Sequence, residues 1–303
     1  MPQPLPILID RLTKTYGKNR GVRDIDLTVE RGEIFGFLGP NGAGKTTTIR
    51  VLIGLLRPTS GGARIFGRDC WGRAGRLHRE IAFIPGDLSL YEQMGVLEFL
   101  SFMARLHGGV RKGRIEGLAE RLELDMQRPI KHLSKGNRQK VGLVQALMHE
   151  APLLVLDEPS AGLDPLKEVV FMQLLAEERA AGRTVFLSSH NLAEVERVCD
   201  RVGIIRDGSL VTVEQVEALK ANRVRQMTIL FRQPVDPRAF EADGIMILER
   251  SDRRLRLSVR GDINPLIRML ARYDLQDLSF SEPSLEDVFL HYYRPSSPAR
   301  VSA

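Results

Sequence analysis

The sequence contains no apolar run long enough to cross a bilayer, because nowhere do 18 apolar residues follow one another. Its first residues, MPQPLPILIDRLTKTYG, lack a basic stretch followed by a long apolar one, so we expect no export signal. Cysteine is scarce, and Cys70 and Cys199 form neither a C-x-x-C pair nor a metal-ligand spacing, which predicts free thiols in a reducing compartment. These absences predict a cytoplasmic chain that does not span a membrane.

Basic blocks interleaved with aromatic residues are also absent, although the net charge is +6. Lysine and arginine are spread along the chain and alternate with acids. This distribution is typical of a solvated surface or of a face near anionic lipid, and we expect no nucleic-acid partner. The 303 residues, 43% hydrophobic and 27% charged, leave room for a large core and a second, smaller domain.

A glycine-rich stretch reads GPNGAGKT and follows the apolar run 34–38, which we expect to be a strand. It has the G-x-x-x-x-G-K-[ST] form of a phosphate-binding loop, in which backbone N–H groups curl round a polyphosphate. A helix that begins near Lys45 points its positive dipole end at the same anion. We expect Lys45 to reach the β- and γ-phosphates and the Thr46 hydroxyl to bind Mg²⁺. The predicted nucleotide-binding residues of this stretch are Gly39, Pro40, Asn41, Gly42, Ala43, Gly44, Lys45, Thr46 and Thr47.

The chain before and after this loop has strand-like patterns. Short alternating apolar stretches between residues 7 and 30 predict strands of an antiparallel edge. Residues 57–62 read as a turn, and 63–67 as another short strand. The periodicity then turns helical from residue 88 to about residue 128, which predicts an all-helical insertion.

Buried strands and helices alternate in the following part of the chain. A helix is expected to begin at Ser134, which can be its N-cap. The apolar runs 152–156 and 184–187 predict buried parallel strands, with a helix over 167–181 between them. This alternation predicts an α/β fold with a mostly parallel sheet.

After about residue 222 the pattern changes and predicts a second domain over 222–294. Its expected elements are strand 225–232, helix 237–242, strand 244–250, strand 253–259, helix 264–273 and strand 275–281. The order β-α-β-β-α-β is the ferredoxin-like arrangement. A last helix is expected from Ser284, with Asp287 completing a capping box, and residues 295–303 read as a disordered tail. The first domain is expected over 1–221, with its helical part over about 88–150.

A phosphate-binding loop alone does not separate a kinase from a GTPase or a motor, so the accompanying residues decide the class. The apolar strand LLVL ends in Asp157-Glu158, which fits a Walker B motif. Asp157 is expected to hold Mg²⁺ through a water, and Glu158 to polarise the attacking water. The alternative interpretation of this pair is an acidic strand terminus or a helix cap.

Three weaker signals accompany these motifs. LSKGN, at residues 133–137, opens a helix with Ser134 and Gly136, which is the chemistry of an anion-binding helix start as well as of an ordinary N-cap. His190 follows a buried strand, where a side chain can reach a γ-phosphate, although a lone histidine is more often a surface residue. Tyr16 lies in a polar turn and can stack on a base, although taken alone it is better explained by packing.

Together these features resemble the ATP-binding cassette (ABC) ATPases, the nucleotide-binding subunits of ABC transporters, over about residues 5–215. The ordered set is Tyr16, GPNGAGKT, LSKGN, LLVLDEP, SAGLD and SSH. The resemblance implies a cassette with a parallel core sheet, an antiparallel β subdomain and a helical subdomain. It also implies a head-to-tail homodimer that holds ATP and Mg²⁺ between the phosphate-binding loop of one copy and Ser134 and Gly136 of the other. Asp164 resembles a residue of the loop along the dimer seam, Glu158 the catalytic base, and His190 the sensor of the γ-phosphate.

Two segments depart from the family pattern. The signature LSGGQ reads LSKGN here, with Lys135 and Asn137 as replacements. The family places a glutamine at the end of the strand before the helical insertion, where this chain has Gly86-Asp87. Gly86 has no side chain that can bind Mg²⁺ or a water, so this position does not predict the usual contact.

The small domain after the cassette, closing in EPSLEDVFL, is similar to that of ATPases that serve ABC-2-type exporters. The sequence therefore predicts an ATP-hydrolysing exporter subunit on the inner face of the cell membrane, paired with a separate integral-membrane permease. Two alternatives stay open at this point. One is a soluble ABC-type ATPase acting on nucleic acid or ribosomes, and the other is a regulatory nucleotide-binding module that does not hydrolyse ATP.

Overall fold

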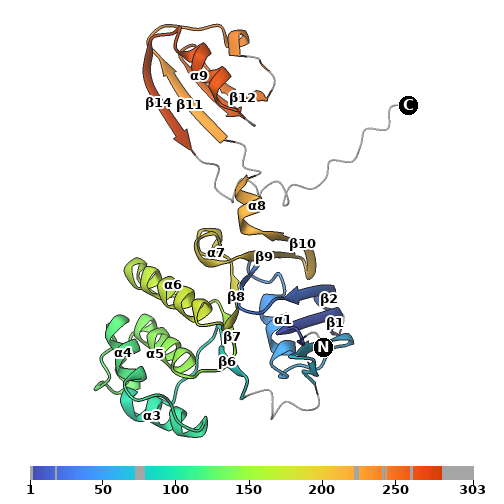
Figure 1. Ribbon diagram of the computed structural model, residues 1–303, viewed down its shortest axis with the longest axis vertical. Helices are drawn as coiled ribbons and strands as arrows, with labels where there is room; N and C mark the ends of the chain where they lie inside the picture. The colour runs from blue at the N-terminus through green and yellow to red at the C-terminus, as the bar shows by residue number, and fades with distance from the viewer. Residues whose placement is uncertain are drawn as a thin grey trace. The chain divides into compact units, whose positions relative to one another are not determined.

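The computed structural model describes residues 3–17, 19–71, 79–221, 225–240, 242, 244–259 and 262–281. The chain divides into two compact units, Met1–Val216 and Glu217–Ala303. The first unit is built on a four-stranded and a six-stranded sheet, and the second on another four-stranded sheet (Figure 1). No helix among the described residues is long and apolar enough to cross a membrane.

The six-stranded sheet has the order β10-β9-β3-β8-β7-β6. Its strands are β10 (Ser209–Gln215), β9 (Arg201–Arg206), β3 (Ile34–Leu38), β8 (Thr184–Ser189), β7 (Leu153–Asp157) and β6 (Ile81–Ile84). All neighbours are parallel except β10, which is antiparallel to β9. Strands β3, β7 and β8 are buried throughout, because helices and the second sheet cover both faces, and this explains their continuous apolar sequences. The predicted parallel core is confirmed.

The antiparallel sheet has the order β2-β1-β4-β5, formed by β1 (Ile7–Tyr16), β2 (Asn19–Val29), β4 (Ser60–Ile65) and β5 (Arg68–Asp69). Its apolar side chains form one core with those of β3 and helix α1 (Lys45–Leu52). The prediction for the third of these strands is wrong by three residues. Residues 60–62 were expected to be a turn, but Ser60 and Gly62 pair with β1, and the strand ends before Phe66 and Gly67 because both have positive φ.

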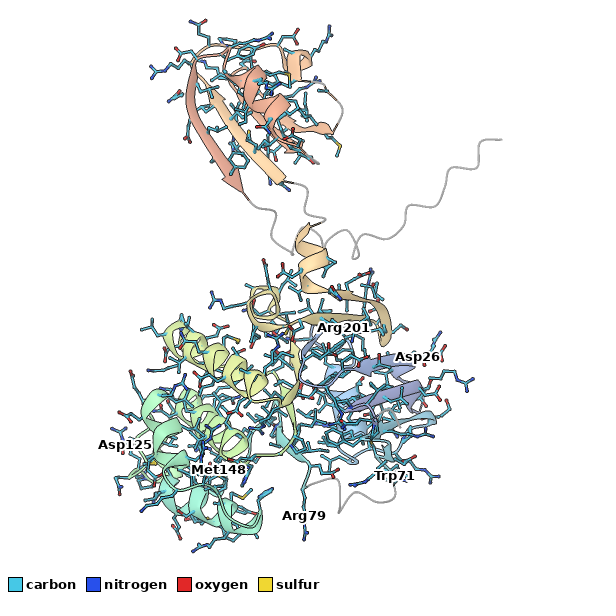
Figure 2. All side chains as sticks on the ribbon, viewed as in Figure 1. Asp26, Trp71, Arg79, Asp125, Met148 and Arg201 are labelled. Carbon is cyan, nitrogen blue, oxygen red and sulfur yellow. The ribbon has the colours of Figure 1, made fainter. Side chains whose placement is uncertain are left out.

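Helices α3 (Val96–Leu106), α4 (Arg114–Arg121) and α5 (Lys135–Met148) gather on one side of the first unit, opposite the antiparallel sheet (Figure 1). They confirm the predicted helical insertion. Figure 2 places Met148 inside this group and Asp125 at its outer side, in agreement with the full burial of Met148. A short 3-10 helix, η1 (Ile130–His132), leads into α5, and α6 (Pro165–Ala180) and α7 (Leu192–Val198) follow β7 and β8.

The second unit is an antiparallel sheet of order β12-β13-β11-β14. Its elements are β11 (Arg225–Phe231), the 3-10 helix η2 (Pro237–Phe240), β12 (Ile245–Arg250), β13 (Arg254–Val259), α9 (Asn264–Leu270) and β14 (Leu275–Ser281). The predicted order of strands and crossovers is present, but the α-helix expected over 237–242 is wrong, because this crossover is a single 3-10 turn. Phe240 anchors it in the core against Phe231. Helix α8 (Val216–Ala221) begins at the boundary between the two units, and the helix expected from Ser284 lies outside the described residues.

Candidate nucleotide site

The glycine-rich loop joins the buried strand β3 to α1, as its sequence predicted. Gly44 is the N-cap of α1 with φ of 111°, a conformation that L side chains rarely adopt. A Cβ on Gly39 would lie 2.4 Å from the Ile205 carbonyl oxygen, so only glycine fits between β3 and β9. The loop is therefore fixed by neighbouring strands, and it presents the uncapped amide end of α1, which is a natural binding site for phosphate.

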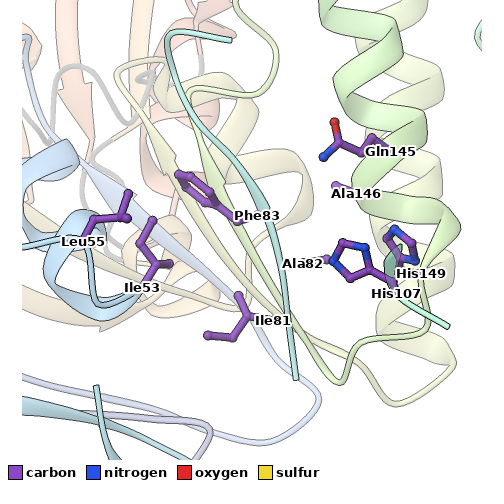
Figure 3. Close-up of a pocket in the computed structure, with 9 residues that line it drawn as sticks. All are labelled: Ile53, Leu55, Ile81, Ala82, Phe83, His107, Gln145, Ala146 and His149. Atoms are coloured by element: carbon purple, nitrogen blue, oxygen red, sulfur yellow. The ribbon is translucent and has the colours of Figure 1, made fainter. Parts of the chain in front are cut away.

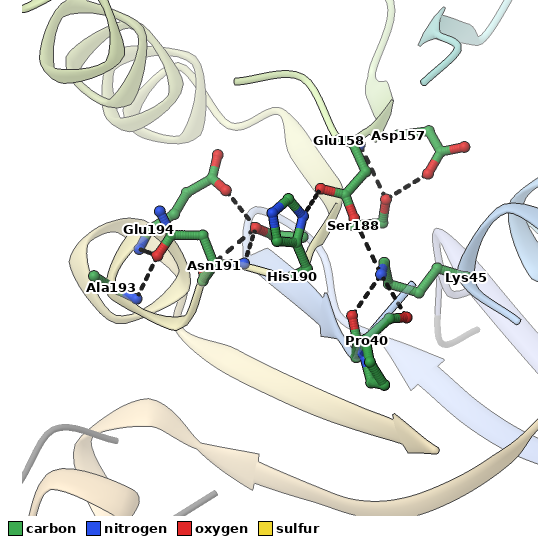
Figure 4. Close-up of polar contacts among 11 residues, drawn as sticks. Pro40, Lys45, Asp157, Glu158, Ser188, His190, Asn191, Ala193 and Glu194 are labelled. Atoms are coloured by element: carbon green, nitrogen blue, oxygen red, sulfur yellow. Dashed lines mark hydrogen bonds and ion pairs between the residues drawn. The ribbon is translucent and has the colours of Figure 1, made fainter. Parts of the chain in front are cut away.

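Lys45 is buried in the first turn of α1 and is 5% exposed. Its Nζ donates to the carbonyl oxygens of Gly39 and Pro40, and it lies 3.0 Å from Glu158 Oε1. The ammonium group is thus held inside the loop that it follows, on the side where Glu158 enters (Figure 4). This arrangement brings the predicted phosphate-binding cation and the predicted catalytic carboxylate into one ion pair.

Asp157 and Glu158 end β7 and are positioned by Ser188 of the neighbouring strand β8. Ser188 Oγ donates to Asp157 Oδ1 over 2.6 Å, and it accepts from the Glu158 backbone N over 3.1 Å. Glu158 has a φ of 48°, in the left-handed region, which turns its side chain away from the strand direction. Its Oε2 lies 2.6 Å from His190 Nδ1. Glu158 therefore lies between Lys45 and His190, as Figure 4 shows.

A pocket of about 220 Å³ is lined by Lys45 and Glu158, whereas Asp157 and His190 are not among its lining residues. Its lining residues are Tyr16, Gly21, Pro40, Asn41, Gly42, Gly44, Lys45, Thr46, Thr47 and Glu158. The exposed Tyr16 is among these residues, and its contact with a base stays a prediction. Sequence reasoning missed Gly21, where a Cβ would lie 2.5 Å from the Lys14 carbonyl oxygen and 3.0 Å from the Tyr16 ring. It also missed Ser188, which only the pairing of β7 with β8 brings to Asp157.

The polar groups beside the pocket fit a magnesium ion that is held mainly by phosphate and water. Among the described residues no three histidine, cysteine, aspartate or glutamate side chains form a metal-binding group of their own. Magnesium usually keeps several waters and takes one or two protein oxygens together with substrate phosphates. The Thr46 hydroxyl in the pocket and the Asp157 carboxylate, which is fixed by Ser188, match that limited set of donors.

The predicted signature residues are not among those that line this pocket. Ser134 caps α5 by accepting a hydrogen bond from the Asn137 backbone N. Gly136 approaches Gly162 so closely that a Cβ on Gly136 would lie 2.6 Å from the Gly162 carbonyl oxygen. Asp164 caps α6 through the Lys167 backbone N. Signature and seam loop are thus packed against each other, and neither lines the pocket.

Gly86 lies directly beside Asp157. A Cβ on Gly86 would lie 3.4 Å from the Asp157 carboxyl carbon. The chain segment that carries a glutamine in the family therefore passes the predicted metal ligand in this chain too, but it contributes backbone and no polar side chain at residue 86.

The turn that carries His190 contains a further buried carboxyl group. Glu194, in the first turn of α7, is 3% exposed and accepts a hydrogen bond from Ser189 Oγ. Burial raises the pKa of Glu194 to about 7, and the hydrogen bonds from Ser189 and Ser160 oppose that rise. Sequence reasoning missed Glu194, which reads there as one of several acids on an amphipathic helix.

A second pocket, of about 310 Å³, lies between α5 and the segment around β6 (Figure 3). Its wall is mostly apolar, and it also includes the rings of His107 and His149, which are tilted by 34° and have centroids 4.1 Å apart. Burial, with His107 and Arg183 nearby, lowers the pKa of His149 to about 4. His149 is therefore neutral at physiological pH.

A phosphate-binding loop whose lysine contacts the glutamate of an aspartate-glutamate strand end, with a histidine on the same glutamate, is the arrangement of a P-loop ATPase. The comparisons with known proteins give its family. A family model described as ABC transporter matches residues 22–161. The bacitracin transport ATP-binding protein BcrA of Bacillus licheniformis is 35% identical over 296 residues, which cover 92% of this chain and 94% of that protein.

Further relatives agree. The Nod factor export ATP-binding protein I of Ralstonia nicotianae is 37% identical over 210 residues, which cover 67% of this chain and 65% of that protein. A solved ATP-binding subunit of an ABC transporter is 32% identical with a TM-score of 0.65, covering 71% of this chain and 91% of that one. A dimeric cassette with bound ADP and phosphate, 24% identical, has the same fold with a TM-score of 0.63.

The chain therefore belongs to the ATP-binding proteins of ABC transporters, and it is an ATP-hydrolysing subunit. This confirms the resemblance drawn from its motifs. The relatives are named for transport, so the alternative of an ATPase acting on nucleic acid or ribosomes gains no support.

Proposed function

We propose that this chain hydrolyses Mg-ATP as a head-to-tail homodimer and drives an ABC-2-type exporter. The observation that carries the proposal is the division of the site. Lys45 and Glu158 line the pocket and His190 contacts Glu158, whereas Ser134 and Gly136 do not line it and contact Asn137 and Gly162 instead. One chain thus supplies the phosphate-binding half, and the helix start at Ser134 of a second copy supplies the other half.

The chemistry follows from the contacts in the pocket. Glu158, held by Lys45 and His190, orients and deprotonates the water that attacks the γ-phosphate. Lys45 and the amide end of α1 bind the phosphate oxygens, and Tyr16 stacks on the base. Thr46 and, through a water, Asp157 would hold Mg²⁺, which neutralises phosphate charge when bound. Once the γ-phosphate is cleaved, the contacts across the seam weaken and the dimer opens.

The decisive experiment uses Glu158→Gln, which keeps the shape of the side chain but removes its basicity. We expect ATP turnover to fall by roughly 10²-fold or more, and the variant to accumulate as an ATP-bound dimer in light scattering. Glu150→Gln, an exposed acid on the loop after α5, is the matched control and should behave as wild type. A Glu158→Gln chain that stays monomeric with ATP would contradict the dimeric site.

The membrane partner is proposed to contact the pocket between α5 and β6. Its apolar wall is rimmed by Leu55, which is 62% exposed, and a cytoplasmic helix of a permease can bury that surface. The location proposed with this contact is the inner face of the cell membrane. The exporter assignment is supported by the relative named for Nod factor export.

Docking is tested by Leu55→Glu, with Leu166→Glu as control because Leu166 is 77% exposed on α6. Co-purification from detergent-solubilised membranes should retain an integral-membrane partner with wild type and with the control. It should lose that partner with Leu55→Glu, while ATP binding stays unchanged. Recovery of nucleic acid and no membrane protein with the wild-type chain would overturn the exporter assignment.

A further inference from the structure

Glu194 is a buried carboxyl group that the hydrolytic scheme above does not use. Its Oε2 is hydrogen-bonded to Ser189 Oγ, and Ser189 immediately precedes His190. The His190 ring in turn contacts Glu158 over 2.6 Å. Figure 4 shows Glu194, Asn191, His190 and Glu158 following one another toward the pocket. A carboxyl group on α7 is thereby linked to the predicted catalytic base through a single turn of chain.

The hydrogen bonds of this turn depend on one hydroxyl proton. Ser189 Oγ accepts from the Asn191 backbone N over 2.9 Å. Its single proton has two possible acceptors, which are the Asn191 carbonyl oxygen at 3.3 Å and Glu194 Oε2. A hydroxyl group donates once and accepts twice, so Ser189 can serve only one of these acceptors at a time.

The protonation state of Glu194 decides between the two. A neutral Glu194 donates its own proton to Ser189 Oγ, and Ser189 then donates to the Asn191 carbonyl, so that the turn 189–191 closes on itself. An ionised Glu194 instead accepts a hydrogen bond from Ser189 Oγ. The Asn191 carbonyl oxygen then has no hydrogen bond from Ser189. Glu194 Oε1 is buried without a hydrogen-bond partner among the described residues, so a negative charge on this carboxylate is poorly compensated.

The surroundings favour the neutral acid. Burial is the main influence against a negative charge on Glu194, Glu168 on α6 and Glu158 after β7 add to it, and Cys199 at the end of α7 is a further titratable group nearby. Ser160, the first residue of the seam loop SAGLD, also lies near the carboxyl group, where it, like Ser189, lowers the pKa and so opposes the effect of burial. Glu194 therefore contacts both the turn of His190 and the loop expected at the dimer seam.

We propose that Glu194 is a positioning residue for ATP hydrolysis, which as a neutral acid holds the turn 189–191 through Ser189 so that His190 faces Glu158. The proposal rests on ATP hydrolysis at the pocket described above. Glu194 contacts neither nucleotide nor the attacking water in this scheme, and it acts only through Ser189 and His190.

The test compares steady-state ATP turnover of the full-length chain and its variants between pH 6 and 8.5. Glu194→Ala and Ser189→Ala should each lower kcat roughly 10-fold while the KM for ATP stays within about 2-fold. The double variant should be no worse than either single one, because both remove the same bond. Glu194→Gln, whose amide can donate to Ser189, should retain the kcat that wild type has at pH 6.

The pH profile separates positioning from a purely structural role. The ratio of kcat for Glu194→Gln to that of wild type should rise from pH 6 to 8.5, because only the wild-type residue loses a proton. Glu196→Gln, on the same helix, is the control and should follow wild type. Additive losses near 100-fold in the double variant, a Glu194→Gln chain as slow as Glu194→Ala, or a flat ratio would each overturn the proposal.

Two further measurements keep the outcome clear. Thermal unfolding and ATP binding are recorded for every variant, and if Glu194→Ala does not fold, the isosteric Glu194→Gln carries the test. A wild-type chain without turnover contradicts hydrolysis itself. Wild-type turnover with all variants equal to it contradicts only the role of Glu194.

Discussion

The phosphate-binding half and the signature half of the site are built in different ways. At the first, side chains from the start of α1 and from the ends of β7 and β8 converge, so that Glu158 contacts both Lys45 and His190 beside a pocket. At the second, the contacts are made by backbone and helix caps. Ser134 and Asp164 bond to the first turns of their own helices, and Gly136 lies against the Gly162 carbonyl.

The difference shows which half can act alone. A converging set of charged side chains can bind phosphate within one chain, whereas a capped helix start only offers amide groups to something that arrives from outside. The half with the caps is therefore suited to close over a nucleotide bound by another copy. Four predictions test this contrast, from the largest effect to the smallest.

The strongest test uses complementation between the halves. Lys45→Met removes the ammonium group that binds phosphate. Ser134→Asp keeps a helix cap but introduces a negative charge at the position where a γ-phosphate is expected to bind. Each variant alone should lose roughly 10²-fold or more in turnover. Mixed in equal amounts, they should regain about a quarter of wild-type activity, because half of the dimers then contain one intact site. If a mixture shown to form heterodimers does not regain activity, the two halves of the site are not supplied by different copies.

The second test concerns the pH dependence of the unfolding free energy of the chain, to which Glu194 beside the turn of His190 contributes. The pKa of Glu194 is raised by burial from 4.5 to about 7 in the folded chain. Between these pH values the folded state keeps a proton that the unfolded state has released. The unfolding free energy should therefore fall as pH rises through this window and level off above it, by up to about 3 kcal/mol. Urea unfolding of Glu194→Gln should lack this decrease, and parallel profiles for variant and wild type would contradict it.

The third test exploits two glycines in neighbouring helices. Gly136→Ala places a Cβ against the Gly162 carbonyl oxygen, so it should destabilise the chain by about 1–3 kcal/mol and lower turnover. Gly117→Ala, within α4, meets no atom within 4 Å and should stabilise by about 0.5–1 kcal/mol. Denaturant unfolding checks both signs. Equal effects would show that the contact between signature and seam loop is loose.

The smallest effect is expected from the cap of α6. Asp164→Ala removes the acceptor of the Lys167 N–H and should cost about 1 kcal/mol of stability, whereas Asp164→Asn keeps a cap. Binding of ATP to the monomer should be unchanged in both, since Asp164 does not line the pocket. Isothermal titration at low protein concentration checks this. A loss of monomer affinity would place Asp164 in the first half of the site.

The sequence was most informative where a structure depends on consecutive residues. The loop 39–46 and the strand end at Asp157-Glu158 could be recognised because their function uses backbone geometry and side chains that are adjacent in the chain. Strands β3, β7 and β8 were predicted because full burial requires continuous apolar runs. Short elements were less predictable: the α-helix expected over 237–242 is a 3-10 turn, since few residues cannot offset the entropy of starting an α-helix.

The phosphate-binding loop that the sequence determined by itself is thus a local feature, fixed by its glycines and the strand before it. The tertiary structure decided what surrounds it. Gly21 reaches the pocket through the pairing of β1 with β2, and Ser188 reaches Asp157 through the pairing of β7 with β8. Glu194 becomes a partner of Ser189 only when α7 folds back on β8. These groups are distant or unremarkable in sequence, and strand register and burial, which no local pattern encodes, give them their chemistry.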